Sequence, residues 1–274
     1  MNPETDAMLS LLTVNIGAAS RERAERLLCW LAARPEDVFV VTETSAGTGT
    51  AYLLDRFRQA GYAVAYTPNS DGDRGAALLS RVAVAEPLAA AFAGVSVPGR
   101  VAAVMLDTEP AVAVLGTYVP SRDRSADKTA KKQTFIESLM AAVDALPAEL
   151  RARLVVGGDY NVIARTHQPL HPGFLPFEYG LLEALAAHGF VDAHEHCAPG
   201  EQPYSWIGRT GDGYRYDYFH VGHQLTKRIT GCAYLHETRE QRLTDHAAVT
   251  LTLDVNAMQR LDTSQPADDA LTLF

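Results

Sequence analysis

The sequence is poor in cysteine. Cys29, Cys197 and Cys232 are its three cysteines among 274 residues, and they lie far apart with no CxxC pair. Disulfide frameworks and zinc sites need several closely spaced cysteines, so neither is expected. Each thiol is predicted to be a small buried hydrophobe, as free cysteines usually are. This usage suits a reducing cytoplasm.

Long apolar runs are also missing. Hydrophobic residues make up 47% of the chain, but no window approaches the roughly eighteen consecutive apolar residues of a membrane span. The opening MNPETDAM is acidic and polar, without the basic stretch and apolar run of a secretory signal. We therefore expect a cytoplasmic protein with no membrane span, and a monomer.

The chain has fewer basic residues than acidic ones. Lysine and arginine number 24 against 33 acidic residues, which gives a net charge of −9. Proteins that grip duplex nucleic acid over a broad surface are usually basic. Three alternatives stay open for a phosphate-bearing substrate: contacts confined to one face, positive charge supplied by metal ions, or a small substrate.

Short apolar runs of strand length are abundant. They predict strands over 9–16, 37–43, 62–67, 75–80, 101–107, 111–118, 153–157, 215–221 and 247–253. Helical spacing occurs in three places: after an N-cap at Ser20, around Phe135 and Val143, and from Pro176 to a C′ glycine at Gly189. Strands outnumber helices and many are joined by short turns. The pattern predicts an α+β fold with two mostly antiparallel sheets packed face to face and helices outside.

Strand density continues through the middle of the chain without a linker rich in glycine, serine or proline. We therefore expect a flexible N-terminus over 1–8, a single catalytic domain over 9–255 and a mobile tail over 256–274.

Polar side chains recur where the predicted strands stop. The set comprises Asn15, Glu43, Asp159, Asn161, Asp245 and His246, with Asp217 inside a further strand. Any one of them is most simply a turn former. Together they indicate a metal site rather than separate turns, because converging carboxylates repel one another unless a cation lies among them. Oxygen ligands favour Mg²⁺, with Mn²⁺ or Ca²⁺ as substitutes, and so predict metal-assisted phosphoryl chemistry.

These residues also carry a family resemblance. The segments LLTVNI, FVVTET, GTYVPS, VVGGDYNV, YRYDYFHVG and LTDHAAVTL occur in that order over 11–253. Their order resembles the endonuclease/exonuclease/phosphatase superfamily, and TYVPSRDRSADK and HPGFLPFEYG are most similar to exonuclease III and the apurinic/apyrimidinic endonucleases. The resemblance implies a four-layer α/β sandwich. Two positions depart from the family pattern: Gly17 replaces a polar residue, which leaves a second metal in question, and Thr42 replaces glutamine.

The resemblance also implies roles for the polar residues. Glu43 would bind Mg²⁺, for which Mn²⁺ could substitute, with Asn15 and Asp245 close by. Asp159 would orient or deprotonate the attacking water. The remaining residues would act on the phosphate: Asn161 would hold it together with the nucleophile, His246 oriented by Asp217 would contact it, and Tyr118 would donate to it. A buried Asp–His pair raises the imidazole pKa, and the resulting cation offsets phosphate charge.

Basic and aromatic residues near these motifs could form a substrate rim. The candidates are Arg122, Lys131, Lys132, Arg215, Trp206 and Phe174. The cations could contact phosphates or simply form a solvated face. The aromatic rings could line a pocket for an extruded base or belong to the core.

Three functions remain open at this stage. The first is a Mg²⁺-dependent DNA nuclease of the exonuclease III or abasic-site type, acting in DNA repair. The second keeps the chemistry and takes a small phosphodiester or phosphomonoester, such as a nucleotide, an inositol phosphate or a phospholipid headgroup. The third is a binding module without catalysis.

Overall fold

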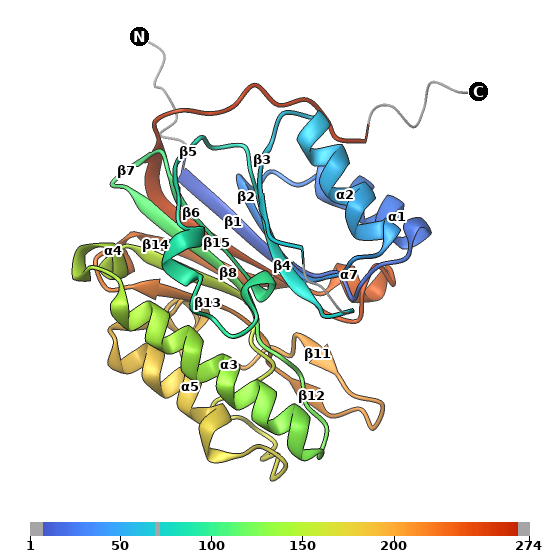
Figure 1. Ribbon diagram of the computed structural model, residues 1–274, viewed down its shortest axis with the longest axis vertical. Coiled ribbons are helices and arrows are strands. Elements are labelled where there is room, and N and C mark those ends of the chain that lie inside the picture. The colour runs from blue at the N-terminus through green and yellow to red at the C-terminus, as the bar shows by residue number, and fades with distance from the viewer. Residues whose placement is uncertain (1–7, 69–71, 268–274) are drawn as a thin grey trace.

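The computed structural model describes residues 8–68 and 72–267, and it shows four layers (Figure 1). Two β-sheets pack face to face, α1 and α2 cover the outer face of one sheet, and α3 and α5 cover the other. The predicted α+β sandwich is confirmed. The helices are α1 (Arg21–Ala32), α2 (Thr48–Gln59), α3 (Ala126–Ala145), α4 (Ala148–Ala152), α5 (Pro176–Ala187), α6 (Ala193–Cys197) and α7 (Glu237–Glu240), with 3-10 turns at Ala89–Phe92, Pro98–Arg100 and Thr226–Arg228.

The first sheet has the order β14-β15-β1-β2-β4-β3, with β7 paired to β15. Its strands are β1 (Met8–Asn15), β2 (Val38–Thr44), β3 (Ala63–Tyr66), β4 (Gly75–Ser80), β7 (Thr108–Glu109), β14 (Ile229–Leu235) and β15 (Ala248–Ala257). The central pair β1 and β2 is parallel, and the other neighbours are antiparallel.

The second sheet has the order β10-β13-β9-β8-β6-β5. Its strands are β5 (Val84–Pro87), β6 (Val101–Leu106), β8 (Val112–Tyr118), β9 (Leu154–Asp159), β10 (Phe190–Asp192) and β13 (Asp217–Gly222), and a small hairpin joins β11 (Trp206–Ile207) to β12 (Gly213–Tyr214). Only β8 and β9 run parallel among the neighbours of this sheet.

Three apolar clusters fill the three gaps between layers. On β1, Leu11 faces the opposite sheet whereas Leu12 faces α1 and α2. On β9, Val155 faces the first sheet whereas Val156 faces α3 and α5. Both faces of these strands are therefore buried, which explains why the sequence shows continuous apolar runs rather than alternation.

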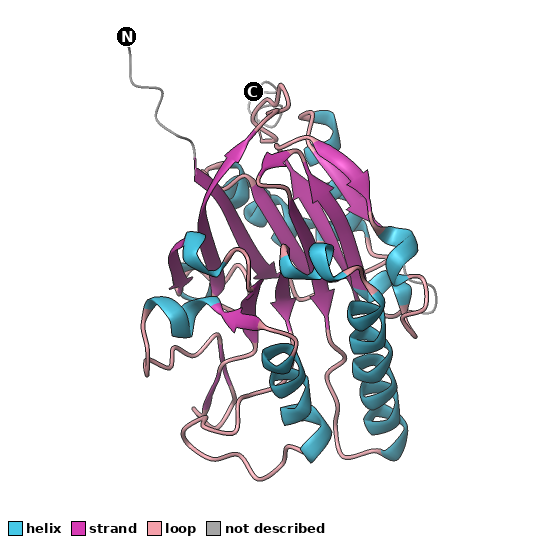
Figure 2. Cartoon of the chain, turned by 90° about the vertical axis from the view of Figure 1, so that its left-hand side faces the viewer, coloured by secondary structure: helices cyan, strands magenta, loops and turns pink. Residues whose placement is uncertain are grey.

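The strand directions bring the polar motifs to one edge of the sandwich. Figure 2 shows the strands (magenta) together with the helices and loops around them. β1, β2, β8 and β9 end at this edge, while β13 and β15 begin there, because they run antiparallel to β9 and β1. Each apolar run buries its strand, and the polar residue after or before it reaches the cleft at the sheet edge.

Several details differ from the sequence-based expectation. Helix α2 was not indicated by the sequence, and α3 begins at Ala126, well before Phe135. Residues 256–267, expected to belong to a mobile tail, extend β15 to Ala257 and then run along the domain: Leu261 N–H donates to Arg81 and Ser264 N–H to Ala60. Residues 1–7 of the N-terminus predicted over 1–8, and residues 268–274 of the predicted tail, lie outside the described residues, and Met8 begins β1.

Candidate active site

A cleft of about 470 Å³ opens where the strand ends converge. Its walls come from the ends of both sheets, the segment before α3, and the β11–β12 hairpin. Sequence-predicted residues in its lining are Glu43, Arg122, Lys132, Asn161, Phe174, Trp206, Asp245 and His246. A hollow of about 410 Å³ between β3 and β6 is lined mainly by alanine, valine and proline, which offer little to a phosphate.

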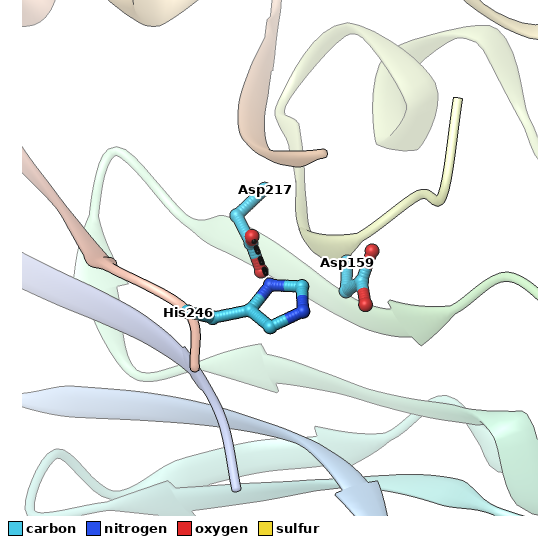
Figure 3. Close-up of side chains that lie close together, drawn as sticks. All are labelled: Asp159, Asp217 and His246. Carbon is cyan, nitrogen blue, oxygen red and sulfur yellow. Dashed lines mark hydrogen bonds and ion pairs between the residues drawn. The ribbon is translucent and has the colours of Figure 1, made fainter. Parts of the chain in front are cut away.

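Asp217 and His246 form a buried pair in this region (Figure 3). His246 Nδ1 lies 2.7 Å from Asp217 Oδ2, and Asp217 is fully buried. Burial alone would lower the pKa of His246, but the charge and hydrogen bond of Asp217 outweigh it and raise that pKa to about 10. The ring is therefore an imidazolium at neutral pH.

Asp159 faces the other side of the imidazolium (Figure 3). The carboxylate accepts from the Asn15 amide at 2.9 Å and from the main-chain N–H of Asn161 at 2.9 Å. Burial and then the nearby charge of Asp217 raise the pKa of Asp159 to about 8. A carboxyl group with a pKa near the working pH is suited to accept a proton from water.

The Asn15 amide donates hydrogen bonds to both Asp159 and Glu43. Its amide nitrogen, which donates to Asp159, also lies 3.2 Å from Glu43 Oε1, and its amide oxygen accepts from Gly17 N–H. Tyr118 donates its hydroxyl to Glu43 at 3.0 Å. Burial, followed by the charges of Glu43 and Asp159, raises the pKa of Tyr118, so the phenol stays a donor.

Two of these residues have a left-handed backbone. The φ angles are +54° at Glu43 and +49° at Asn161. Asparagine tolerates this region, whereas glutamate does so at a cost on the order of 1–3 kcal/mol, and such strain clusters at functional sites. The strand ends at Asp159, and the turn of the chain that follows brings the Asn161 amide within 3.2 Å of the Asp159 carboxylate.

The two glycines before Asp159 are required by close packing. A Cβ on Gly158 would lie 2.0 Å from the Thr117 carbonyl of β8, and Gly158 has φ +141°. A Cβ on Gly157 would lie 2.4 Å from the Phe219 ring. This close packing holds the end of β9, and with it Asp159, between β8 and β13.

Asp159, Asp217 and His246 have donor atoms within 4.8 Å of one another, an arrangement that could hold a cation. An imidazolium has no free lone pair for a metal, however. Glu43 and Asp245 line the same cleft, and Asp245 is exposed. Carboxylate and amide oxygens of this kind suit a hard divalent cation.

Comparisons with known proteins identify the family. The endonuclease/exonuclease/phosphatase family pattern matches residues 12–266. The chain belongs to this family. Enzymes of this family depend on divalent metal ions. As a member, the chain is a phosphoester hydrolase, as the sequence predicted. A search of curated proteins finds no match.

Solved structures show the same fold as this family member. An AP endonuclease from Archaeoglobus fulgidus aligns with a TM-score of 0.73 and 21% identity, over 90% of this chain and 100% of its own. The 3′-5′ exonuclease NExo from Neisseria meningitidis aligns with a TM-score of 0.71 and 21% identity, over 90% and 100%. The 3′ phosphatase NExo from Neisseria, bound to a product DNA hairpin, gives 0.71 and 21%, over 90% and 99%.

Two of the predicted rim cations, Lys132 and Arg122, form ion pairs with one buried glutamate, Glu178. Lys132 is 1% exposed, and its Nζ donates to Glu178 Oε1 and to the Asn161 carbonyl, both at 2.6 Å. Arg122 Nη2 pairs with Glu178 Oε2 at 2.5 Å. Lys132 is therefore a buried support of the Asn161 turn rather than an exposed phosphate contact. Arg122 lines the cleft with its charge partly neutralised.

Two further rim predictions are not confirmed. Arg215 is 8% exposed and pairs with Asp192 at 2.7 Å, so it lies beneath the site rather than on the rim. Lys131 is exposed but pairs with Asp73 at 2.6 Å, outside the cleft lining. A buried cation needs a buried anion, and these partners lie too far away in sequence to be recognised from it.

Replacing Lys132 with methionine should lower the free energy of unfolding by about 1–3 kcal/mol, because buried Glu178 keeps Arg122 but loses its second cation, and the Asn161 carbonyl loses its donor. The matched control is Lys128→Met, also on α3, which removes an exposed pair with Asp123 in the segment before the helix. That control should cost much less, because an exposed ion pair contributes little to stability. Chemical denaturation of the two variants measures the difference, and equal losses would show that the buried pair contributes no more than the exposed one.

Aromatic rings form one wall of the cleft. Trp206 stacks on Tyr216 with 5.9 Å between centroids, and Tyr216 stacks on Tyr214 at 5.2 Å. The Trp206 indole donates to Asp245 Oδ2 at 3.0 Å, so the wall contacts a predicted metal ligand. Phe174 also lines the cleft. Both predicted aromatic rim residues therefore lie at the cleft rather than in the core.

Three further residues support the site without having been predicted from the sequence: Glu178, Ser205 and Tyr234. Glu178 holds Lys132 and Arg122, as described above. The Ser205 hydroxyl accepts from Asp217 N–H at 3.1 Å, and Tyr234 donates to the Asp217 carbonyl at 2.5 Å.

The described ranges contain no helix long and apolar enough to cross a membrane.

Proposed function

We propose that this enzyme hydrolyses DNA phosphodiester bonds with Mg²⁺, as an exonuclease III-like nuclease or abasic-site endonuclease. The observation that carries the proposal is the hydrogen-bonded group of Asp159, Glu43 and the Asp217–His246 pair, of which Glu43 and His246 line the cleft and the two aspartates lie buried behind them. The cleft combines a base, a cation and open acidic ligands, which is what in-line attack on a phosphodiester requires. Structural neighbours that include a DNA-bound 3′ phosphatase support DNA as the substrate.

The proposed roles follow from the geometry. Asp159 takes a proton from the attacking water, while Asn161 and Asn15 orient its carboxylate. His246 donates from Nε2 to a phosphate oxygen, since its Nδ1 is held by Asp217. Tyr118 orients Glu43 in this structure rather than pointing to a phosphate, so it would act through that carboxylate unless substrate binding releases it.

Glu43, Asn15 and Asp245 are the proposed holders of Mg²⁺. Their oxygen donors fit a hard cation, and Mn²⁺ could substitute. When bound, the metal would supply positive charge that offsets the charge of the phosphate. Asn15 would have to turn its amide oxygen away from Gly17 to bind the metal directly. Otherwise it positions Glu43 and Asp159 through its nitrogen.

A small phosphoester is the second candidate substrate. It is favoured by the net charge of −9 and by the neutralisation of Arg122 and Lys132 by Glu178. A panel of an abasic duplex, an undamaged duplex, single-stranded DNA, RNA and a chromogenic bis-phosphodiester, each with Mg²⁺, separates the candidates. Preference for the abasic duplex or for DNA 3′ ends supports the proposal, whereas hydrolysis of the chromogenic ester alone would contradict it.

Binding of DNA should weaken steeply with salt, because each neutralised phosphate contributes about 0.9 to the slope of log K against log salt. Arg124 is exposed in the cleft lining. Its replacement by alanine should reduce that slope by about 1. The matched control is Arg228→Ala, next to the start of β14 at the opposite end of the sheet. Salt titrations of DNA affinity measure both, and a shallow slope in the wild type would point to a small substrate.

A further inference from the structure

Arg215 is a buried cation with two different partners. Its Nη2 donates to Asp192 Oδ1, and its Nε donates to the hydroxyl oxygen of Tyr234, both at 2.7 Å. Desolvation of an ion costs on the order of several kcal/mol, and a carboxylate partner with good geometry can offset that cost. Asp192 provides the carboxylate. The second bond, to Tyr234, fixes the direction in which that phenol donates.

Tyr234 donates across the sandwich. It belongs to β14 of the first sheet, and its hydroxyl proton goes to the main-chain carbonyl of Asp217 on β13 of the second sheet, at 2.5 Å. With the guanidinium donating to its oxygen, the phenol has its proton free for this carbonyl. Arg215, Tyr234 and Asp217 therefore form a directed chain of hydrogen bonds that ends beside the site.

The carbonyl of Asp217 lies on an open side of its strand. Tyr216, one residue earlier, has its carbonyl bonded to the N–H of Tyr160 after β9. Successive carbonyls of a strand point to opposite sides, so that of Asp217 points toward β10. The pairing with β10 stops at Asp192, opposite His220. The Tyr234 hydroxyl thus takes the place of a missing strand donor.

We propose that Tyr234, oriented by Arg215, is a positioning residue for the Asp217–His246 pair. Asp217 belongs to the second sheet, whereas His246 lies two residues before β15 of the first. Their 2.7 Å hydrogen bond therefore depends on how the two sheets are held together at this edge. Tyr234, from the same sheet as His246, ties the main chain of Asp217 to that sheet. This role rests on the proposed function, because the pair affects turnover only if it serves the hydrolysis.

Tyr234→Phe tests the role by removing one oxygen atom. We expect kcat on the preferred DNA substrate to fall about 10- to 100-fold, as for other residues that orient a functional group from behind, while KM stays unchanged. The control is Tyr160→Phe, which also removes a buried hydroxyl, bonded to the Val156 carbonyl at 3.1 Å. Thermal unfolding of both variants measures the loss of stability. Wild-type kcat in Tyr234→Phe would overturn the proposal and leave Tyr234 a packing residue.

A spectroscopic readout separates this proposal from the proposed function. The proton between His246 Nδ1 and Asp217 should give a downfield ¹H resonance that is lost in His246→Ala. We expect this resonance to shift or broaden in Tyr234→Phe and to stay unchanged in Tyr160→Phe. If the wild type hydrolyses no DNA in the panel, the proposed function fails and the resonance alone decides the positioning role. An unshifted resonance in Tyr234→Phe would contradict the role whatever the substrate.

Discussion

Asp159→Asn is expected to lower kcat by about 10²–10⁴-fold, because the substitution removes the group that accepts the proton of the attacking water. Asparagine keeps the shape of the side chain, but its amide cannot take that proton. The Asn15 and Asn161 donors that now hold the carboxylate would bind one amide oxygen at most. Steady-state kinetics with Mg²⁺ on the DNA substrate that the wild type cleaves best measures the loss.

A matched control for Asp159→Asn is available at the far end of the same sandwich. Asp37 is also buried, at 3% exposure, and accepts from Ser10 and Arg260 just before β2 begins. Asp37→Asn should destabilise the fold and leave kcat unchanged. Turnover near that of the wild type in Asp159→Asn would refute the assignment of the base. A similar drop in both variants would point to loss of folding rather than of chemistry.

Chelation of divalent ions is expected to abolish turnover, and added Mg²⁺ or Mn²⁺ to restore it. Glu43→Gln should then raise the Mg²⁺ concentration for half-maximal rate by at least about tenfold, because supports of a metal site alone are worth 10- to 100-fold. The reason is that Glu43 lies in the cleft with an oxygen held by Asn15 and Tyr118. Rate measured against Mg²⁺ concentration reports the shift.

The control for Glu43 is Glu36→Gln. Glu36 is 5% exposed and pairs with Arg34 before β2, away from the cleft. It should leave the Mg²⁺ dependence unchanged. Full turnover with excess EDTA would remove the metal from the proposal, and an unaltered Mg²⁺ requirement in Glu43→Gln would move the metal to other ligands, such as the group around Asp159.

The parts of the site that follow strands could be predicted from the sequence. Asn15, Glu43 and Asp159 each terminate an apolar run, and parallel central strands bring such ends to one edge. The helix around Phe135 and the cap at Ser20 were likewise visible in the spacing of residues. Helix α2 was not indicated, because its first residues, Thr48, Gly49 and Thr50, have weak helical preference.

The errors concern charged residues whose partners are distant in sequence. Lys132 pairs with Glu178, 46 positions away, and Arg215 pairs with Asp192, 23 positions away. Charged side chains are mostly exposed, so the rim was the reasonable prediction for both. Nothing local distinguishes a paired lysine from a solvated one. Tyr234 was missed for the same reason, since its role depends on a carbonyl in the other sheet.

Because β1 pairs with β15, the active site can be completed only late in the synthesis of the chain. Among the described strands β1 is made first and β15 last. β15 begins two residues after His246, which itself lies 231 residues after Asn15. Until β15 emerges from the ribosome, β1 lacks a neighbour along one side and offers an edge for aggregation. His246 emerges from the ribosome together with β15. A nascent chain therefore covers the open edge of β1 and gains the imidazolium that it needs for hydrolysis in the same step.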